Sequence, residues 1–224
     1  MIVAIDGPAG AGKSTVARGL ARRLGAGYLN TGAMYRAITR LALDAGLAPS
    51  DGPALARLAA DRPVRLVPGP EGERVLAGGR DLTEAIRDAD VTASVSEVSA
   101  HRGVRLAVVA AQRALLSEGD WVADGRDVGS VVWPDAEVKV FLTASPRERA
   151  RRRRDELAAL GQVSSLAEVE ADLARRDRLD STRAESPLVV APGAVVVDTS
   201  DLDADAVVDR LAGLAAEARA AARA

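Results

Sequence analysis

The chain has 224 residues, of which 48% are hydrophobic and 28% charged, and its net charge is −2. This balance is typical of a folded globular protein, and the near-neutral charge disfavours a general nucleic-acid binder. The absence of cysteine excludes disulfides and thiolate metal sites. No apolar run reaches the roughly 18 residues that a membrane helix needs. We therefore expect a cytoplasmic enzyme.

Five short apolar runs predict the strands of the core. They lie at residues 2–5, 27–29, 121–123, 138–142 and 194–197. Helical patterns separate them, which predicts an α/β fold with a five-stranded parallel sheet and helices on both faces. The first helix is expected over residues 12–24 with Gly25 as its end, and the second over residues 31–46. A last helix is expected after Asp203.

Two segments do not fit this core. Residues 63–82 alternate apolar and polar side chains on both sides of a Pro/Gly/Glu turn, which predicts a β-hairpin. The arginine-rich segment from Ser145 to Arg183 begins with a capping box over residues 145–148, which predicts a helix that ends at Gly161. Ser164 or Ser165 is expected to begin a second helix. One core with two insertions is the predicted plan.

The segment after the first strand has the spacing of a phosphate-binding loop. Gly7-x-x-x-x-Gly12-Lys13-Ser14 matches the P-loop signature in its expected context, between a strand and a helix. Backbone N–H groups and the helix N-terminus then face the phosphates. Lys13 is predicted to bridge the β- and γ-phosphates, and Ser14 to ligate Mg²⁺. The predicted ATP-binding residues are Gly7, Pro8, Ala9, Gly10, Ala11, Gly12, Lys13, Ser14 and Thr15.

The use of lysine in this loop is informative. Of the 30 basic residues only Lys13 and Lys139 are lysine, so the loop contains the rarer cation of this chain. A compact ammonium fits inside a tight loop where a planar guanidinium does not. Asp124, an acid at the end of the strand predicted at residues 121–123, is expected to reach Mg²⁺ through water. A turn-capping role is the alternative for Asp124.

Several classes of P-loop protein remain to be compared. A GTP-dependent timer needs an Asn-Lys-x-Asp guanine reader, which the chain lacks. Arginine clusters on both insertions favour an enzyme that closes on two phosphorylated substrates. A small-metabolite kinase of the shikimate-kinase type and a regulatory protein that slowly hydrolyses its nucleotide stay open as alternatives. The run of residues 151–154 is also compatible with a nucleic-acid patch, but the chain has only 2% aromatic residues to stack on bases.

The chain resembles the bacterial-type cytidylate kinases, which are nucleoside monophosphate kinases with a P-loop NTPase-type fold. The resemblance rests on GPAGAGKST, LNTGAMYR, SEVSAHRGVR, ADGRDVGSVVWPDA and RRDRLDSTRAESPL. It implies a core at residues 1–30, 103–145 and 184–224, a monophosphate-binding insertion with the hairpin at 31–102, and a helical lid at 146–183. It further implies a monomer that transfers the γ-phosphate of ATP, with Mg²⁺, to CMP or dCMP, and that has no nucleic-acid or membrane partner.

The resemblance also implies roles for particular residues. The CMP-binding residues are expected to be Thr31, Arg36 and Arg126 for the phosphate, Ser96, Arg105 and Asp127 for cytosine, Arg176 and Asp180 for the sugar, and Arg183 for a phosphate on the lid side. Taken singly, Ser96 is also typical of a solvent-facing or capping serine on a helix, and Arg105 is typical of a solvated helix face. Catalysis is assigned to Lys13, Arg126, Arg149 and Arg153.

The expected chemistry follows from charge. The acceptor is already an ionised phosphate oxygen, so no general base is expected, and the cations offset charge on the moving phosphoryl group. Asp127 can accept a hydrogen bond from the amine of cytosine, whereas uracil has a carbonyl at that position. Adenine is expected near the loop after Asp198 and a lid arginine. Ala9 departs from the relatives that have serine there, which removes one possible contact to the acceptor phosphate.

Overall fold

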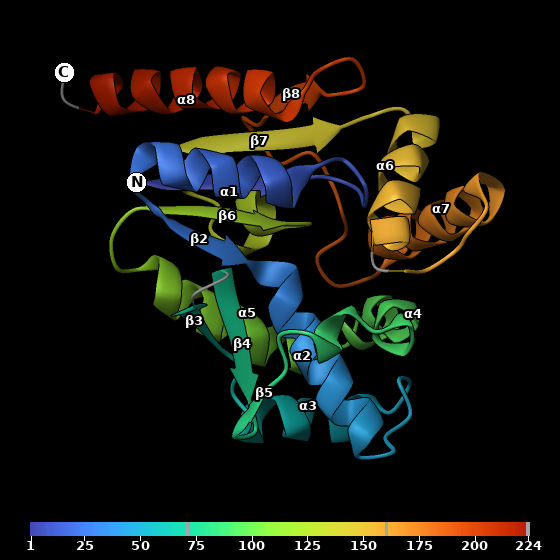
Figure 1. Ribbon diagram of the computed structural model, residues 1–224. Coiled ribbons are helices and arrows are strands. Elements are labelled where there is room, and N and C mark those ends of the chain that lie inside the picture. Colours follow the sequence, from blue (N-terminus) through green and yellow to red (C-terminus); the bar gives the residue numbers. More distant parts are fainter. Residues whose placement is uncertain (70–71, 160, 223–224) are drawn as a thin grey trace. The chain divides into compact units, whose positions relative to one another are not determined.

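The computed structural model describes residues 1–69, 72–159 and 161–222 (Figure 1). The chain divides into two compact units. Unit 1 comprises Met1–Leu29, Gly119–Thr182 and Ser186–Ala224, and unit 2 comprises Asn30–Glu118 and Arg183–Glu185. The finer division into core, monophosphate-binding insertion and lid stays a prediction.

Unit 1 is built on a parallel sheet whose five strands were all predicted. In spatial order these are β2 (Gly27–Asn30), β6 (Trp121–Gly125), β1 (Ile2–Asp6), β7 (Val138–Thr143) and β8 (Val195–Asp198). The central strand β1 pairs in parallel with β6 and with β7, and β7 pairs in parallel with β8. The predicted α/β fold with a five-stranded parallel sheet is therefore confirmed.

The register of these strands brings their carboxyl ends to one edge. Asp6 lies opposite Gly125 on one side and opposite Phe141 on the other. The phosphate loop leaves β1 at this edge, and the segment 126–129 leaves β6 there. Ligands of open α/β sheets bind outside this edge, so the sheet itself positions the candidate residues of unit 1.

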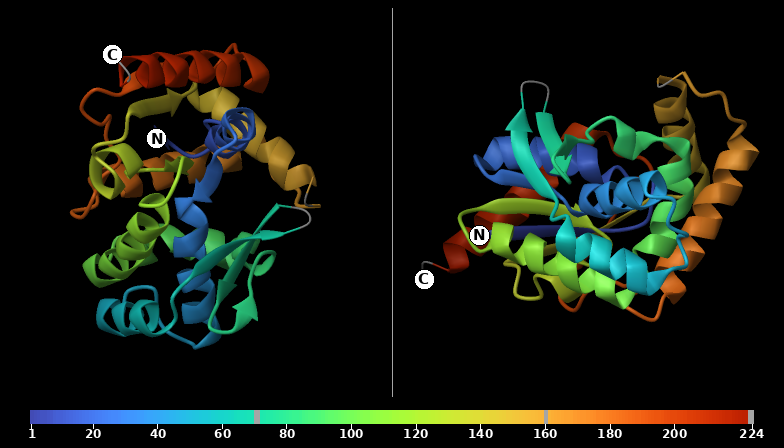
Figure 2. Two further views of the ribbon diagram at one scale, coloured as in Figure 1. Left: turned by 90° about the vertical axis from the view of Figure 1, so that its left-hand side faces the viewer. Right: turned by 90° about the horizontal axis from the view of Figure 1, so that it is seen from below.

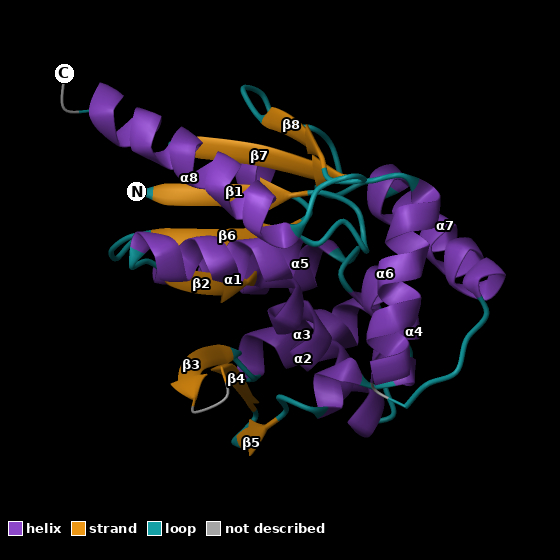
Figure 3. Cartoon of the chain, turned by 45° about the horizontal axis from the view of Figure 1, so that its top comes forward, coloured by secondary structure: helices purple, strands orange, loops and turns teal. Residues whose placement is uncertain are grey.

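Two helices cover one face of the sheet. Figures 1 and 3 show α1 (Lys13–Leu24) and α8 (Ala204–Ala221) beside one another, with α1 over β6 and α8 over β7. The apolar side chains that meet there are fully or almost fully buried, and they include Val3, Ile5, Val16, Leu20, Val140, Leu142, Val207 and Leu211. Because side chains alternate along a strand, Asp6 faces the opposite side, where the short π-helical turn η2 (Val128–Val132) packs.

The boundaries of these helices follow local sequence signals. The first helix ends at Gly25, whose φ of 64° is left-handed, as the sequence predicts. The last helix begins after Asp203, whose side chain accepts a hydrogen bond from the Ala206 N–H at 2.7 Å.

The arginine-rich segment forms two packed helices, α6 (Pro146–Ala159) and α7 (Leu166–Thr182). The predicted capping box at Ser145 is only half formed. The Ser145 hydroxyl accepts from the Glu148 N–H, but the Ser145 N–H donates to Ser200 instead of Glu148. Glu148 pairs with Arg151 and Arg152, and these ion pairs occupy its carboxylate. Ser165 caps α7 with both halves of a capping box to Glu168.

Unit 2 contains four α-helices among its described residues, namely α2 (Thr31–Asp44), α3 (Gly52–Asp61), α4 (Ala89–Val98) and α5 (Arg102–Leu116). The short helical turn η1 (Ala85–Arg87) precedes α4. The predicted hairpin is present as antiparallel β3 (Arg65–Gly69) and β4 (Gly72–Ala77), which Figure 2 shows side by side, and β5 (Arg80–Asp81) adds a third strand. The tip of the predicted hairpin turn, residues 70–71, lies outside the described residues. Within the described chain, no helix has the length and apolar character needed to cross a membrane.

Candidate active site

The phosphate loop is held by backbone packing against the sheet. Gly7 has a φ of 147°, and a Cβ atom there would lie 2.0 Å from the carbonyl oxygen of Leu142 in β7. Gly12, with a φ of 84°, precedes the first residue of α1. Only glycine adopts both conformations without strain. The loop therefore curls tightly and ends at a helix N-terminus, where the partial positive charge favours an anion.

Lys13 lies inside this loop. Its side chain is buried, and Nζ donates a hydrogen bond of 2.7 Å to the carbonyl oxygen of Pro8. Burial lowers the pKa of Lys13 well below its usual value, and the positive charge of Arg126 lowers it further. The nearby carboxylates, Asp124 foremost, oppose this shift of the pKa. A buried ammonium held by a neutral carbonyl is well suited to exchange that partner for a phosphate oxygen.

The two residues predicted to hold Mg²⁺ lie in contact. The Ser14 hydroxyl donates to Oδ2 of Asp124 at 2.5 Å, and the Tyr28 hydroxyl donates to Oδ1 at 3.3 Å. Asp124 is buried, and burial raises its pKa, whereas the hydrogen bond from Ser14 and the charge of Lys13 act in the opposite direction. Tyr28 is an addition that the sequence did not signal.

This pair fits the ligand preference of Mg²⁺. The ion prefers oxygen ligands and keeps several waters, so one or two protein oxygens suffice alongside substrate phosphates. Among the described residues there is no group of three or more His, Cys, Asp or Glu that could hold a metal. Ser14 and Asp124 therefore fit a site that water and phosphate complete.

Three arginines of unit 1 lie close enough to repel one another. Arg126 donates from Nε to Asp180 at 2.9 Å. Arg176 is buried, and burial, followed by the charges of Arg126 and Arg153, lowers its pKa to about 10, while Asp180 opposes this shift. Its Nε finds no hydrogen-bond partner within the described chain. Together with Lys13, these residues form a cationic cluster near the phosphate loop, which we define as Lys13, Arg126, Arg153 and Arg176.

The two arginines that the sequence assigned to the lid have different partners. Arg149 donates from Nη1 to Asp177 of α7 at 2.6 Å and to the carbonyl oxygen of Ala9 at 3.1 Å. It thereby joins α6 and α7 to the phosphate loop. Arg153 donates to Glu156 within α6 at 2.8 Å, and it also contributes to the cationic cluster.

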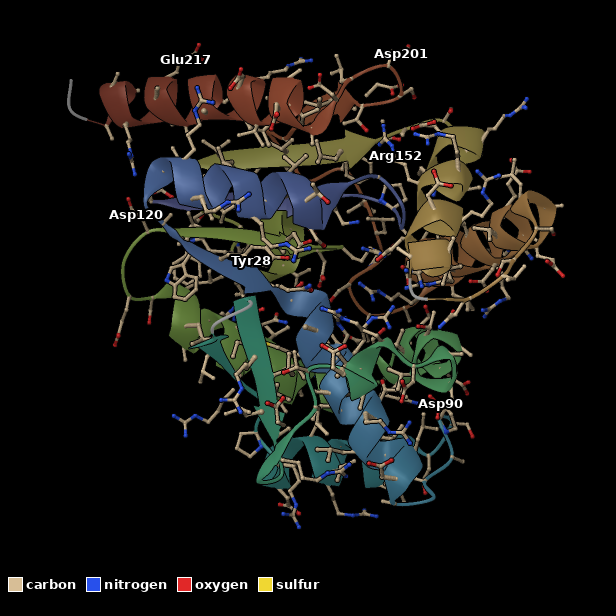
Figure 4. The ribbon with its side chains drawn as sticks, in the orientation of Figure 1. Tyr28, Asp90, Asp120, Arg152, Asp201 and Glu217 are labelled. Atoms are coloured by element: carbon tan, nitrogen blue, oxygen red, sulfur yellow. The ribbon has the colours of Figure 1, made fainter. Side chains whose placement is uncertain are left out.

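The geometry adds Arg152 and Thr199 to the candidate residues. Arg152, labelled in Figure 4, extends from α6 toward the loop after β8 and donates to Oγ1 and to the carbonyl oxygen of Thr199, at 2.9 and 2.6 Å. Thr199 is buried and donates in turn to the carbonyl oxygen of Thr143 at 3.0 Å. This is the loop where the sequence predicts adenine. Residues 151–154 are all arginine, so the sequence does not show which of them contacts Thr199.

Unit 2 contains Thr31, Arg36, Ser96, Arg105 and Arg183 of the predicted CMP-binding residues. Thr31 is the first residue of α2, which Asn30 caps by accepting from the Ala33 N–H at 3.0 Å. Arg36 donates to the carbonyl oxygen of Ile86 at 3.0 Å and to Thr92 of α4 at 2.9 Å. The first turn of α2 and the guanidinium of Arg36 are thus fixed by hydrogen bonds.

The predicted base-reading residues of unit 2 are not solvated surface residues. Ser96 is 7% exposed and Arg105 is 4% exposed. Arg105 donates to the carbonyl oxygen of Ser99 at 3.3 Å, and its guanidinium lies 5.3 Å from the centre of the Tyr35 ring. This cation–π contact joins α5 to α2 and holds the guanidinium in place. The alternative reading of both residues as solvated helix positions is therefore wrong.

The segment after β6 contains the third predicted base reader, Asp127. This residue is buried, and its carbonyl oxygen accepts from the N–H groups of Val131 and Val132. The neighbouring N–H groups of Val128 and Gly129 donate to Asp6 of β1, each at 2.8 Å. The sequence carries the same signal for Asp6 as for Asp124, namely an acid at the end of an apolar strand.

Asp6 predicts a pH dependence of stability. Burial is the main cause that raises its pKa to about 6 from 3.8, and the charge of Asp127 adds to the shift. Between these values the folded chain binds more protons than the unfolded chain, so the free energy of unfolding falls as the pH rises. Relative to Asp6→Asn, which cannot titrate, the wild type should lose up to about 3 kcal/mol between pH 4 and pH 7. Urea unfolding of both proteins at several pH values measures this difference. The prediction is contradicted if the free energy of unfolding of the wild type, relative to Asp6→Asn, rises between pH 4 and pH 7.

Comparison with known proteins adds independent information. The family model described as cytidylate kinase matches residues 3–217. The chain is 51% identical over 213 residues to a cytidylate kinase of Exiguobacterium sibiricum, covering 95% of this chain and 96% of that one. It is 51% identical over 215 residues to a cytidylate kinase of Mycolicibacterium paratuberculosis, covering 96% and 94%.

A longer relative shows the same similarity over part of its length. The chain is 54% identical over 215 residues to a bifunctional pantoate ligase/cytidylate kinase of Synechococcus sp. (strain CC9902). The match covers 95% of this chain but 44% of that protein, so the chain spans less than half of this relative.

Proposed function

Because the chain belongs to the cytidylate kinase family, we propose that it transfers the γ-phosphate of ATP to CMP and dCMP, giving CDP and dCDP. The observation that carries this proposal is the cationic cluster of Lys13, Arg126, Arg153 and Arg176. Within it, Arg176 has a lowered pKa and a buried Nε that has no hydrogen-bond partner among the described residues. Cations that repel one another favour an anionic ligand, and phosphoryl transfer brings two phosphate groups together.

Lys13 and the N–H groups of the phosphate loop would bind the donor phosphates. Mg²⁺, bound by Ser14 and through water by Asp124, would neutralise charge on the phosphates when present. Arg149 donates to the carbonyl oxygen of Ala9 in this loop, which supports the proposal that its guanidinium would approach the γ-phosphate. The acceptor oxygen is ionised already, and we assign no general base.

The acceptor is proposed to bind to the residues that the family resemblance assigns. Thr31, Arg36 and Arg126 would bind its phosphate, and Arg176, Asp180 and Arg183 would bind the sugar and a neighbouring phosphate. Asp127 would accept from the cytosine amine, while Arg105 would donate to its O2 and N3 atoms. Their burial supports this role, because hydrogen bonds to charged groups discriminate best where water is excluded.

One experiment tests the function against its alternatives. ADP release from ATP and Mg²⁺ should depend on an added acceptor, with CMP and dCMP far better than UMP, AMP or shikimate. A coupled assay of each acceptor, with a reaction lacking acceptor as the control, measures this dependence. A small-metabolite kinase would respond to shikimate, and a regulatory NTPase would release ADP at one slow rate whatever acceptor is added; either result contradicts the proposal.

A further inference from the structure

Asp6 joins the central strand to the turn that follows β6. Its side chain is 3% exposed, and each carboxylate oxygen accepts one backbone N–H, Oδ1 from Val128 and Oδ2 from Gly129, both at 2.8 Å. These two N–H groups begin η2, and the first N–H groups of a helical turn have no partner within the turn. Asp6 therefore caps η2 from a neighbouring strand.

The residue that would normally cap this turn is Asp127. It stands at the N-cap position of η2, with φ −151° and ψ 24°, and aspartate is among the preferred residues there. Yet its side chain makes no capping hydrogen bond. Asp6 caps η2 instead, so the Asp127 carboxylate does not hydrogen-bond to the first N–H groups of η2.

We propose that Asp6 is a positioning residue for recognition of the acceptor base. By capping η2 in place of Asp127, it holds the Asp127 carboxylate in the orientation that accepts the amine of a cytosine. Asp6 touches neither the base nor the reacting phosphates. This inference rests on the proposed role of Asp127 and adds the residue that makes that role possible.

The fit of the turn on Asp6 is close. A Cβ atom at Gly129 would lie 3.4 Å from Oδ2 of Asp6 and 3.1 Å from the side-chain carbons Cγ and Cδ of Lys139. The lysine stem is flexible and can move away from a single methyl group. A branched side chain at position 129 would also press on the carboxylate and lift the turn from it. Position 129 thus allows the turn to be displaced without altering Asp6.

The first test is Asp6→Asn, which keeps the shape but presents an amide N–H₂ to one of the two backbone N–H groups. The CMP-over-UMP ratio of kcat/KM should fall by about fivefold or more, and KM for CMP should rise, because a buried N–H loses its acceptor. The ratio does not depend on the fraction of folded enzyme, so a merely structural role would not change it.

Two variants of Gly129 test the position of η2: Gly129→Val displaces it, and Gly129→Ala leaves it in place. Gly129→Val should lower the CMP-over-UMP ratio in the same way, whereas Gly129→Ala should keep it near the wild-type value. Leu211→Ala, in the core between α1 and α8, is the control for lost stability and should keep the ratio as well. If Asp6→Asn does not fold, Gly129→Val decides the question.

The outcomes separate this inference from the role on which it rests. Suppose that Asp127→Asn lowers the CMP-over-UMP ratio. The role of Asp6 is then overturned if Asp6→Asn keeps the wild-type ratio. If Asp6→Asn cannot be purified, a wild-type ratio in Gly129→Val overturns it. An unchanged ratio in Asp127→Asn overturns the role of Asp127 and, with it, that of Asp6. Lower ratios in Asp127→Asn, Asp6→Asn and Gly129→Val, with wild-type ratios in both controls, support the positioning role.

Discussion

Replacement of Lys13 by alanine should lower turnover with CMP by at least about 100- to 1,000-fold, as expected for the loss of one preorganised donor to a developing charge. Lys13 is buried in the phosphate loop with its ammonium on the carbonyl oxygen of Pro8. The chain has only one other lysine, Lys139. Steady-state kinetics at saturating ATP and CMP measure the effect, and circular dichroism checks the fold.

Two variants show whether the effect belongs to this position and this cation. Lys13→Arg should not restore turnover, because the planar guanidinium does not fit the space that the loop leaves around Nζ. Lys139→Ala is the matched control: its ammonium is exposed and donates to the carbonyl oxygen of Pro134, so turnover should stay within about twofold. Near-normal turnover of Lys13→Ala would refute the assigned role.

Replacement of Asp127 by asparagine should narrow the preference for CMP over UMP by about 10- to 100-fold. The carboxylate accepts from the amine of cytosine, whereas an asparagine amide can donate to the carbonyl that uracil presents instead. Leaving a buried polar group without its partner costs about 1–3 kcal/mol, which corresponds to about 5- to 150-fold and includes this range. The substitution does not change the backbone of residue 127, so its carbonyl oxygen can still accept from the N–H groups of Val131 and Val132.

The measurement is the ratio of kcat/KM values for CMP and UMP. Asp135→Asn removes an exposed carboxylate from the same connection between β6 and β7 and should leave the ratio unchanged. If Asp127→Asn keeps the wild-type ratio, the base is read by other residues.

Much of the fold is visible in the sequence because local signals and burial agree. The five strands are short apolar runs, and the central strands β1 and β6 are buried on both faces, as is typical of a covered parallel sheet. Gly25 ends α1 and Asp203 begins α8 as predicted. The half-formed cap at Ser145 shows the limit of this reasoning: Glu148 has arginines within one turn, and their charge competes for the carboxylate that a capping box needs.

The candidate site was predictable where residue type and position act together. Ser14 and Asp124 were assigned to one metal ion, and they do lie in contact. Asp6, Tyr28 and Thr199 were not identified, because their contacts cross between strands and loops far apart in the sequence. Arg152 is one of four consecutive arginines, and only the helix geometry decides which of them reaches Thr199.

The P-loop signature combines residues that the fold requires with residues that catalysis requires, and Gly7 belongs to the first kind. Its Cβ would collide with the backbone of β7 whether or not a nucleotide is bound. A descendant of this chain that had lost its catalytic activity would thus still retain Gly7, for the sake of folding. The fold does not require Lys13 and Ser14 in this way. Substitutions at these two positions, and not loss of the glycine, would therefore identify a pseudoenzyme.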